Sequence, residues 1–62
     1  MPTKEQIGEY IPFYLKNHDM TVAEFAEKLK VSRITVYNWI QKETVPTYIN
    51  YITLLSILRE CF

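Results

Sequence analysis

Two helix-starting signals that lie close together, at Thr21 and Ser32, constrain the fold of this chain more than any other feature. Thr21 and Glu24 have the spacing of a capping box, in which each side chain bonds the backbone N–H of the other residue. Ser32 is a favourable N-cap for a second helix. The pattern therefore predicts a helix from Val22, a tight turn at Lys30 and Val31, and a second helix after Ser32.

The apolar spacing indicates which faces of these two helices meet. The expected buried positions are Phe25, Ala26 and Leu29 in the first helix and Val36, Trp39 and Ile40 in the second. Ala26 is small, as is needed where two helices cross steeply and their backbones come close. Caps, crossing and turn together predict a helix-turn-helix.

One position departs from that pattern. The turn favours glycine in a left-handed conformation, but this chain has Lys30 there, at an expected cost of about 1–2 kcal/mol. The alternative interpretation is an ordinary helical hairpin within a small bundle. Such a hairpin does not require these caps, this crossing and this turn spacing together.

The segment before the motif has its own capping pair, Thr3 and Gln6, which predicts a first helix from residue 4. Pro12 interrupts this helix and crowds the carbonyl of Gly8, whose flexible backbone can absorb a kink. The alternative is a break at Ile11, with Pro12 opening a new turn. The expected buried stripe is Ile7, Ile11 and Leu15, with Tyr14 beside it. His18 follows in a loop and has no carboxylate partner at useful spacing.

The last helix is expected to begin after the N-cap Thr47 and to end at about Arg59. Its apolar arc spans roughly 220°, whereas a surface helix needs about 100°. The expected core face is Tyr48, Tyr51, Ile52, Leu55, Leu58 and Phe62. The side of the arc, formed by Asn50, Leu54, Ile57 and Cys61, is assigned to a homodimer interface, although the first helix is an alternative cover.

These elements predict an all-α fold: a compact four-helix bundle, or five helices if the first one divides, in a single domain over residues 1–62. A chain of this length buries only about 60% of its unfolded surface, so a monomer would be marginal. The 48% hydrophobic content therefore indicates a dense core or an apolar surface that meets a second copy.

Composition also limits the classes of function. The single Cys61 excludes an internal disulfide and a cysteine-based metal cluster, and fits a reducing cytoplasm. We expect no signal peptide and no membrane span, because no apolar run reaches roughly 18 residues. No nucleophile–base pair, carboxylate dyad, phosphate loop or metal-spaced cluster is present, so no enzyme, cofactor, metal or small-molecule ligand is predicted.

The chain resembles the Cro and lysogeny-repressor type of phage helix-turn-helix protein, which is XRE-like and lambda-repressor-like. The similarity covers about residues 7–58. It rests on the opening Ile7-Gly8-Glu9-Tyr10-Ile11, on Met20-Thr21 before Phe25-Ala26, on the segment from Val31 to Trp39, and on Pro46 before a capped apolar helix. The resemblance implies a compact all-α bundle that binds double-stranded operator DNA as a dimer.

Several positions depart from that family. The family often has a phosphate-binding glutamine where this chain has Val22, and a glycine at Lys30. Many members also pair an arginine with a glutamate at the positions of Leu15 and Ile40. Here both partners are apolar, as if the ion pair had been replaced whole, and such a replacement is often neutral or stabilising.

The second motif helix would enter the major groove by its N-terminal half. The predicted base-contacting residues are Arg33 for guanine, Asn38 for adenine, Ile34 for a thymine methyl group, and Gln41. The predicted phosphate-contacting residues are Thr21, Ser32, Thr35, Tyr37, Lys42 and Thr47. The net charge of zero argues against strong DNA binding, so we expect modest affinity that depends on pairing of two subunits.

The neutral charge also favours a second hypothesis, a protein-interaction module such as an antirepressor or an assembly factor. Tyr37, Trp39 and Tyr48 would be its aromatic anchors. DNA binding weakens steeply with salt, so a titration at two salt concentrations distinguishes the two functions.

Overall fold

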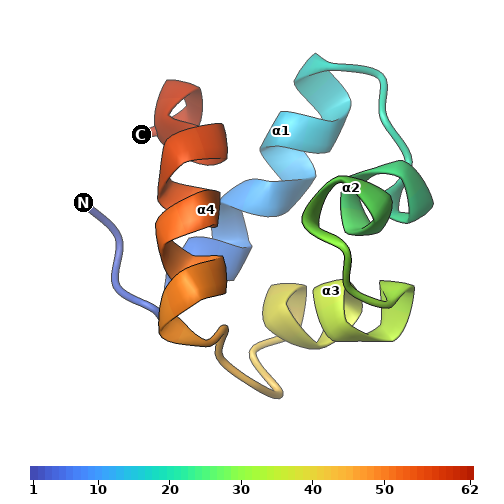
Figure 1. Ribbon diagram of the computed structural model, residues 1–62. Coiled ribbons are helices and arrows are strands. Elements are labelled where there is room, and N and C mark those ends of the chain that lie inside the picture. Colours follow the sequence, from blue (N-terminus) through green and yellow to red (C-terminus); the bar gives the residue numbers. More distant parts are fainter.

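The computed structural model describes all residues 1–62 and contains helices but no strands. Four α-helices form the bundle of Figure 1: α1 (Ile11–Asn17), α2 (Val22–Leu29), α3 (Arg33–Ile40) and α4 (Tyr48–Leu58). Two 3-10 helices extend it: η1 (Ile7–Tyr10) before α1, and η2 (Arg59–Cys61) after α4. The predicted all-α four-helix fold is confirmed. No helix has the length and apolar character needed to cross a bilayer.

The N-terminal segment divides where Pro12 requires it. The capping pair forms, with the Thr3 N–H donating to Gln6 Oε1 (3.1 Å) and the Gln6 N–H donating to Thr3 Oγ1 (3.3 Å). A turn and η1 follow, and α1 begins at Ile11 with Pro12 in its first turn. An N–H in a first turn has no partner within the helix, so proline loses nothing there. The predicted α-helix from residue 4 is therefore wrong, and the alternative break at Ile11 is confirmed.

Gly8 has a different use from the one expected. A Cβ atom at this position would lie 2.1 Å from the backbone oxygen of Trp39, which real atoms cannot do. The absence of a side chain allows η1 to lie directly against the C-terminal end of α3. Gly8 thus permits a close backbone approach and does not relieve a kink.

The core lies between η1, α1, α2, α3 and α4. Its fully and nearly buried apolar side chains are Ile7, Ile11, Tyr14, Phe25, Ala26, Leu29, Val36, Trp39, Leu54 and Leu58. Leu15 and Ile40 are half-buried and pack against this core. Two apolar side chains therefore lie at these positions, at the edge of the core.

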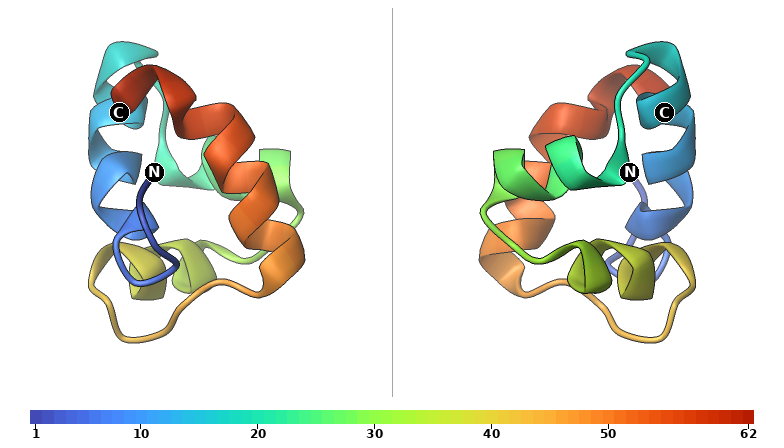
Figure 2. Two further views of the ribbon diagram at one scale, coloured as in Figure 1. Left: turned by 90° about the vertical axis from the view of Figure 1, so that its left-hand side faces the viewer. Right: turned by 90° about the vertical axis from the view of Figure 1, so that its right-hand side faces the viewer.

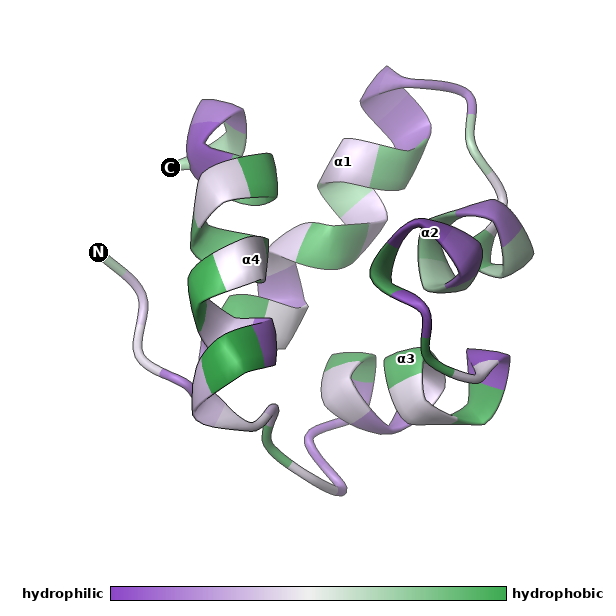
Figure 3. Ribbon diagram, viewed as in Figure 1, coloured by the Kyte–Doolittle hydropathy of each residue, from purple (hydrophilic) through white to green (hydrophobic).

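The rotation of α4 about its axis differs from the prediction. Leu54 is 0% exposed and Leu58 is also fully buried, whereas Tyr48 is 66% exposed and Ile52 and Phe62 are exposed. At ~100° per residue, the true core face is turned by roughly 70° from the expected one. The pattern failed because only Asn50, Thr53 and Ser56 interrupt the apolar residues of α4. Green bands recur along the visible side of α4 in Figure 3, while α2 shows both purple and green segments.

This rotation corrects the predicted dimer interface. Leu54 has no surface left for a partner, so its assignment to the interface is wrong. Asn50, Ile57 and Cys61 are half-buried beside it.

Burial raises the pKa of the Cys61 thiol, and the carboxylate of Glu60 raises it further, so the thiol stays protonated at neutral pH.

Contacts between residues far apart in the sequence attach both ends of the chain to the bundle. His18 Nε2 lies 2.9 Å from Glu60 Oε2, and the His18 ring stacks on Tyr14 with centroids 4.2 Å apart. His18 is exposed as expected, but the expectation that it has no carboxylate partner is wrong, because Glu60 comes from the far end of the chain. At the other end, the Tyr51 hydroxyl donates to the Pro2 carbonyl.

Candidate nucleic-acid interface

The geometry of α2, the turn and α3 follows from their caps. Both bonds of the capping box form: the Glu24 N–H donates to Thr21 Oγ1 (3.1 Å) and the Thr21 N–H donates to Glu24 Oε1 (2.9 Å). Ser32 Oγ accepts from the Thr35 N–H at 3.1 Å. Both predicted helix starts are therefore confirmed.

The turn between α2 and α3 has the predicted left-handed residue. Lys30 has φ 58° and ψ 43°, and the N–H of Val31 donates to the Ala26 carbonyl at 3.0 Å. This bond reaches back over the left-handed residue and satisfies a carbonyl at the end of α2, as in a Schellman turn. The chain thus adopts the expected turn although it lacks the glycine that favours it.

α3 has one face in the core and one face in solvent. Val36 is fully buried and Trp39 is 3% exposed, while Ile34 is 72% exposed and Tyr37 is 48% exposed. At ~100° per residue, Arg33, Ile34, Tyr37 and Gln41 lie within about 100° of one another around the helix. Both views in Figure 2 place α3 at one end of the molecule, away from the α1–α2 connection.

Most of the predicted site residues are exposed, and those on α3 lie at one end of the molecule. Among the predicted base contacts, Arg33, Ile34 and Gln41 are exposed and Asn38 is half-buried at the edge of the same face. Among the predicted phosphate contacts, Thr21, Ser32, Tyr37, Lys42 and Thr47 are exposed and Thr35 is half-buried.

Two capping side chains have little hydrogen-bonding capacity left. The Thr21 hydroxyl lies 3.2 Å from Glu24 Oε1, so both its N–H and its O–H are used by Glu24. The Ser32 hydroxyl lies 2.9 Å from the Thr35 hydroxyl. A phosphate at α2 would have to use the free backbone N–H groups after Thr21, next to the Glu24 carboxylate.

The two cations that flank α3 differ in their partners. Arg33 is exposed and forms no ion pair, whereas the Lys42 ammonium is bound by the Glu9 carboxylate. Lys42 also has a left-handed backbone, with φ 64°. Sequence reasoning missed this pair, because no local spacing joins Glu9 to Lys42 and only the packing of η1 on α3 brings them together.

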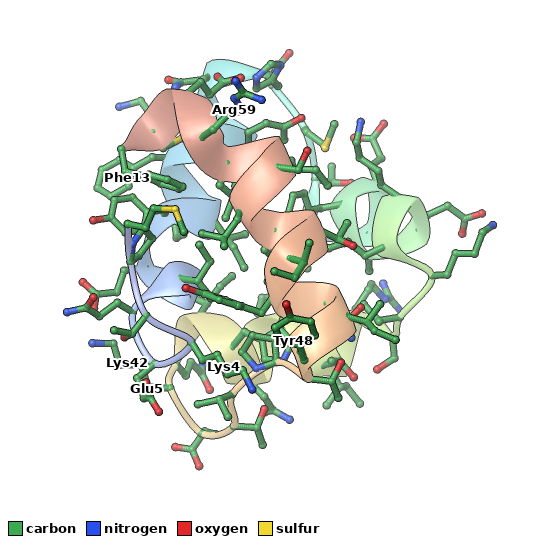
Figure 4. All side chains as sticks on the ribbon, turned by 60° about the vertical axis from the view of Figure 1, so that its left-hand side comes forward. Lys4, Glu5, Phe13, Lys42, Tyr48 and Arg59 are labelled. Carbon is green, nitrogen blue, oxygen red and sulfur yellow. The ribbon has the colours of Figure 1, made fainter.

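Lys4 is a further cation at this end of the molecule. Its Nζ lies 5.9 Å from the centroid of the Tyr48 ring, at the start of α4. Figure 4 shows Lys4, Lys42 and Tyr48 toward the end that holds the α3–α4 loop, whereas Arg59 lies at the opposite end. Glu5 lies at the same end, and Glu9 and Glu43 lie beside Lys42, so these cations give the surface around α3 no clear excess of positive charge.

The comparisons agree with this geometry. A family model described as helix-turn-helix matches residues 14–60, which is most of the chain. No curated protein and no solved structure matches it. The matched family consists of regulatory DNA-binding domains and is not a family of enzymes. The chain therefore belongs to the XRE-type helix-turn-helix family, whose members bind double-stranded DNA and regulate transcription.

Proposed function

We propose that this protein is a Cro-like repressor of phage or prophage origin, which acts in the cytoplasm on a near-palindromic operator. The observation that carries the proposal is the two-sided character of α3. Its buried side chains fix it to the core, and Arg33, Ile34 and Tyr37 stand exposed at one end of the molecule. A helix held in this way can enter the major groove.

Base reading is assigned to the outer face of α3. Arg33 can form a bidentate bond to guanine O6 and N7, and Asn38 can do likewise with adenine. Ile34 makes no hydrogen bond but suits a thymine methyl group. Gln41 lies one turn further along this face and is exposed.

Phosphate contacts are assigned around this face. Tyr37 is exposed within this face, Lys42 is exposed just beyond the end of α3, and the helix starts at Thr21, Ser32 and Thr47 offer backbone N–H groups. Thr35 is half-buried, so only its hydroxyl edge would reach the backbone of DNA. These contacts position the helix without reading sequence.

The operator complex is proposed to contain two copies of the chain. With Leu54 in the core, the pairing surface is assigned to the apolar side chains that are exposed on or just before α4, namely Val45, Tyr48, Ile49 and Ile52. They follow the α3–α4 loop directly, so two-fold pairing through them would place both α3 helices on one face of DNA, ~34 Å apart. Asn50, Ile57 and Cys61, which the sequence assigned to the interface, lie roughly 130° or more around α4 from the middle of this patch at ~100° per residue and stay outside this pairing surface.

This patch is small for a dimer interface. Four side chains are far fewer than the ~20–30 residues per partner of a standard interface. The free protein is therefore expected to dimerise weakly, with the operator supplying the rest of the association energy. Sedimentation with and without operator duplex tests this, and Ile49→Glu should abolish pairing while the monomer stays folded.

The test of the function is selection of bound sites from random duplexes, followed by titration of a selected site at two salt concentrations. A DNA-binding regulator should enrich a near-palindrome and should lose affinity steeply as salt rises. Recovery of no common sequence would contradict the proposal.

A protein-interaction module is the second candidate. The exposed Tyr48 and Ile49 favour it, because large apolar side chains in solvent often mark protein contacts. Trp39, one of its predicted anchors, is buried in the core and cannot serve. Absence of salt-dependent duplex binding would favour this candidate over a repressor.

A further inference from the structure

The ammonium group of Lys42 already has an anionic partner inside the molecule. Glu9 Oε2 binds Lys42 Nζ, and both side chains remain about half exposed. Only one other ion pair forms, between His18 and Glu60, so none of the other lysines and arginines is paired with a carboxylate. The cation placed at the end of α3 is thus the one basic group of the motif that is neutralised.

The surrounding backbone brings this pair together. Gly8 lets η1 approach the Trp39 carbonyl, and Glu9 is the next residue along η1. On the other side, the Lys42 N–H donates to the same Trp39 carbonyl at 3.2 Å, and the left-handed backbone of Lys42 ends the helix there. Both partners therefore emerge from segments that meet at one carbonyl group, which the Lys42 N–H bonds and which Gly8 approaches closely.

We propose that Glu9 competes with DNA phosphates for Lys42, and so weakens the binding of DNA of any sequence. This inference rests on the proposed function, in which Lys42 contacts a phosphate. A phosphate oxygen can approach the ammonium only by displacing or sharing the Glu9 carboxylate, and the displaced carboxylate would remain close to the polyanion. Each effect opposes binding, and neither depends on the base sequence.

The consequence is that a single subunit binds DNA weakly, so that stable binding depends on two subunits together. A lone motif with Lys42 neutralised has little charge with which to hold DNA, because nonspecific affinity comes mainly from lysine and arginine at phosphates. Arg33 remains unpaired and available for base reading. Occupation of a site then relies on base contacts from two subunits more than on the phosphate contacts of one.

The test compares variants by their affinity for a labelled duplex of mixed sequence, about two helical turns long. Glu9→Gln should bind about threefold more tightly than wild type at low salt, the scale of an exposed ion pair. Glu5→Gln is the matched control, since Glu5 is exposed, lies near the same end and has no ion pair. It removes the same charge and should have a clearly smaller effect.

Lys42→Ala separates competition for Lys42 from general repulsion. In that background Glu9→Gln should lose most of its effect, because the group it releases is gone. The proposal is overturned if Glu9→Gln gains no more than Glu5→Gln, or if its gain persists without Lys42. Thermal unfolding should show all variants folded, since the pair lies at the surface.

The wild-type titration keeps the two proposals distinct. If wild-type protein binds duplex with the expected salt dependence and Glu9→Gln has no effect, only the competition fails. If wild-type protein binds no duplex, the proposed function fails, and the competition fails with it.

Discussion

α3 and α4 begin alike but differ in how well their sequence defines their packing. Each starts at a hydroxyl N-cap, Ser32 or Thr47, whose Oγ accepts the backbone N–H three residues later. Both predicted starts are confirmed. The buried face of α3 also agrees with the prediction, while that of α4 is turned by roughly 70° at ~100° per residue.

The difference lies in the polar residues of each helix. α3 has Arg33 at its start and Gln41 at its C-cap, both more than about 100° from the buried Trp39 at ~100° per residue, which disfavours rotations that would bury either one, although Ile34 and Tyr37 are also exposed. α4 carries apolar residues on most of its circumference at ~100° per residue, so its polar residues exclude few rotations. A cap is a local signal that defines where a helix begins. The rotation of the helix about its axis is defined only when a polar face excludes the other possible buried faces.

The largest expected effect tests the rotation of α4. Leu54→Ala should lower the free energy of unfolding by about 2–5 kcal/mol, because it leaves a cavity at a fully buried position. Ile49→Ala is the matched control on the same helix, where Ile49 is 76% exposed. It should change stability by no more than about 0.5 kcal/mol. Urea denaturation followed by circular dichroism measures both, and equal losses would contradict the rotation described above.

The next effect concerns the polar face of α3. Arg33→Ala should cost about 1–3 kcal/mol of binding to a selected site and relax the preference at one base pair. Arg59→Ala removes the same charge at the opposite end of the molecule and should leave the base preference unchanged. Competition between site variants measures this, and an unaltered preference after Arg33→Ala would remove α3 from the role of reading helix.

Much of the fold was predictable because its signals are local. The capping boxes at Thr3 and Thr21, the cap at Ser32 and the left-handed turn at Lys30 each involve residues five or fewer positions apart. The course of the first helix was predictable only as two alternatives. Pro12 is compatible with a kink or with a helix start, and the packing of η1 on α3 decides between them.

The candidate site was predictable where it depends on one helix and not where it depends on several. The exposure of Arg33, Ile34 and Tyr37 follows from the pattern of α3 alone. The partner of Lys42 does not, because Glu9 reaches it through the contact that Gly8 permits. The pairing of His18 with Glu60 was also missed, because its two residues lie 42 positions apart and only the packing of the chain brings them together.

A smaller effect compares the two caps directly. Ser32→Ala should lower the free energy of unfolding by about 1 kcal/mol through loss of the bond to the Thr35 N–H. Thr47→Ala should cost less, because the bond from the Asn50 N–H is longer, at 3.4 Å against 3.1 Å. Chemical denaturation resolves the two losses, and a larger loss at Thr47 would show that α4 depends on its cap more than α3 does.

The smallest effect concerns the turn between α2 and α3, where the chain has Lys30 at a left-handed position that favours glycine. Lys30 is held at φ 58°, which costs a non-glycine residue about 1–2 kcal/mol. Glycine removes that cost but loses more entropy on folding, by about 0.5–1 kcal/mol, so Lys30→Gly should stabilise the fold by about 0.5–1 kcal/mol. Asp19→Gly is the control, because Asp19 is also left-handed, at φ 51°, but aspartate tolerates that region better and should gain less. If Lys30→Gly did not raise the melting temperature, the left-handed conformation of Lys30 would carry no net cost. The helix caps at Thr21 and Ser32 would then determine the stability of this turn more than the residue type at position 30 does.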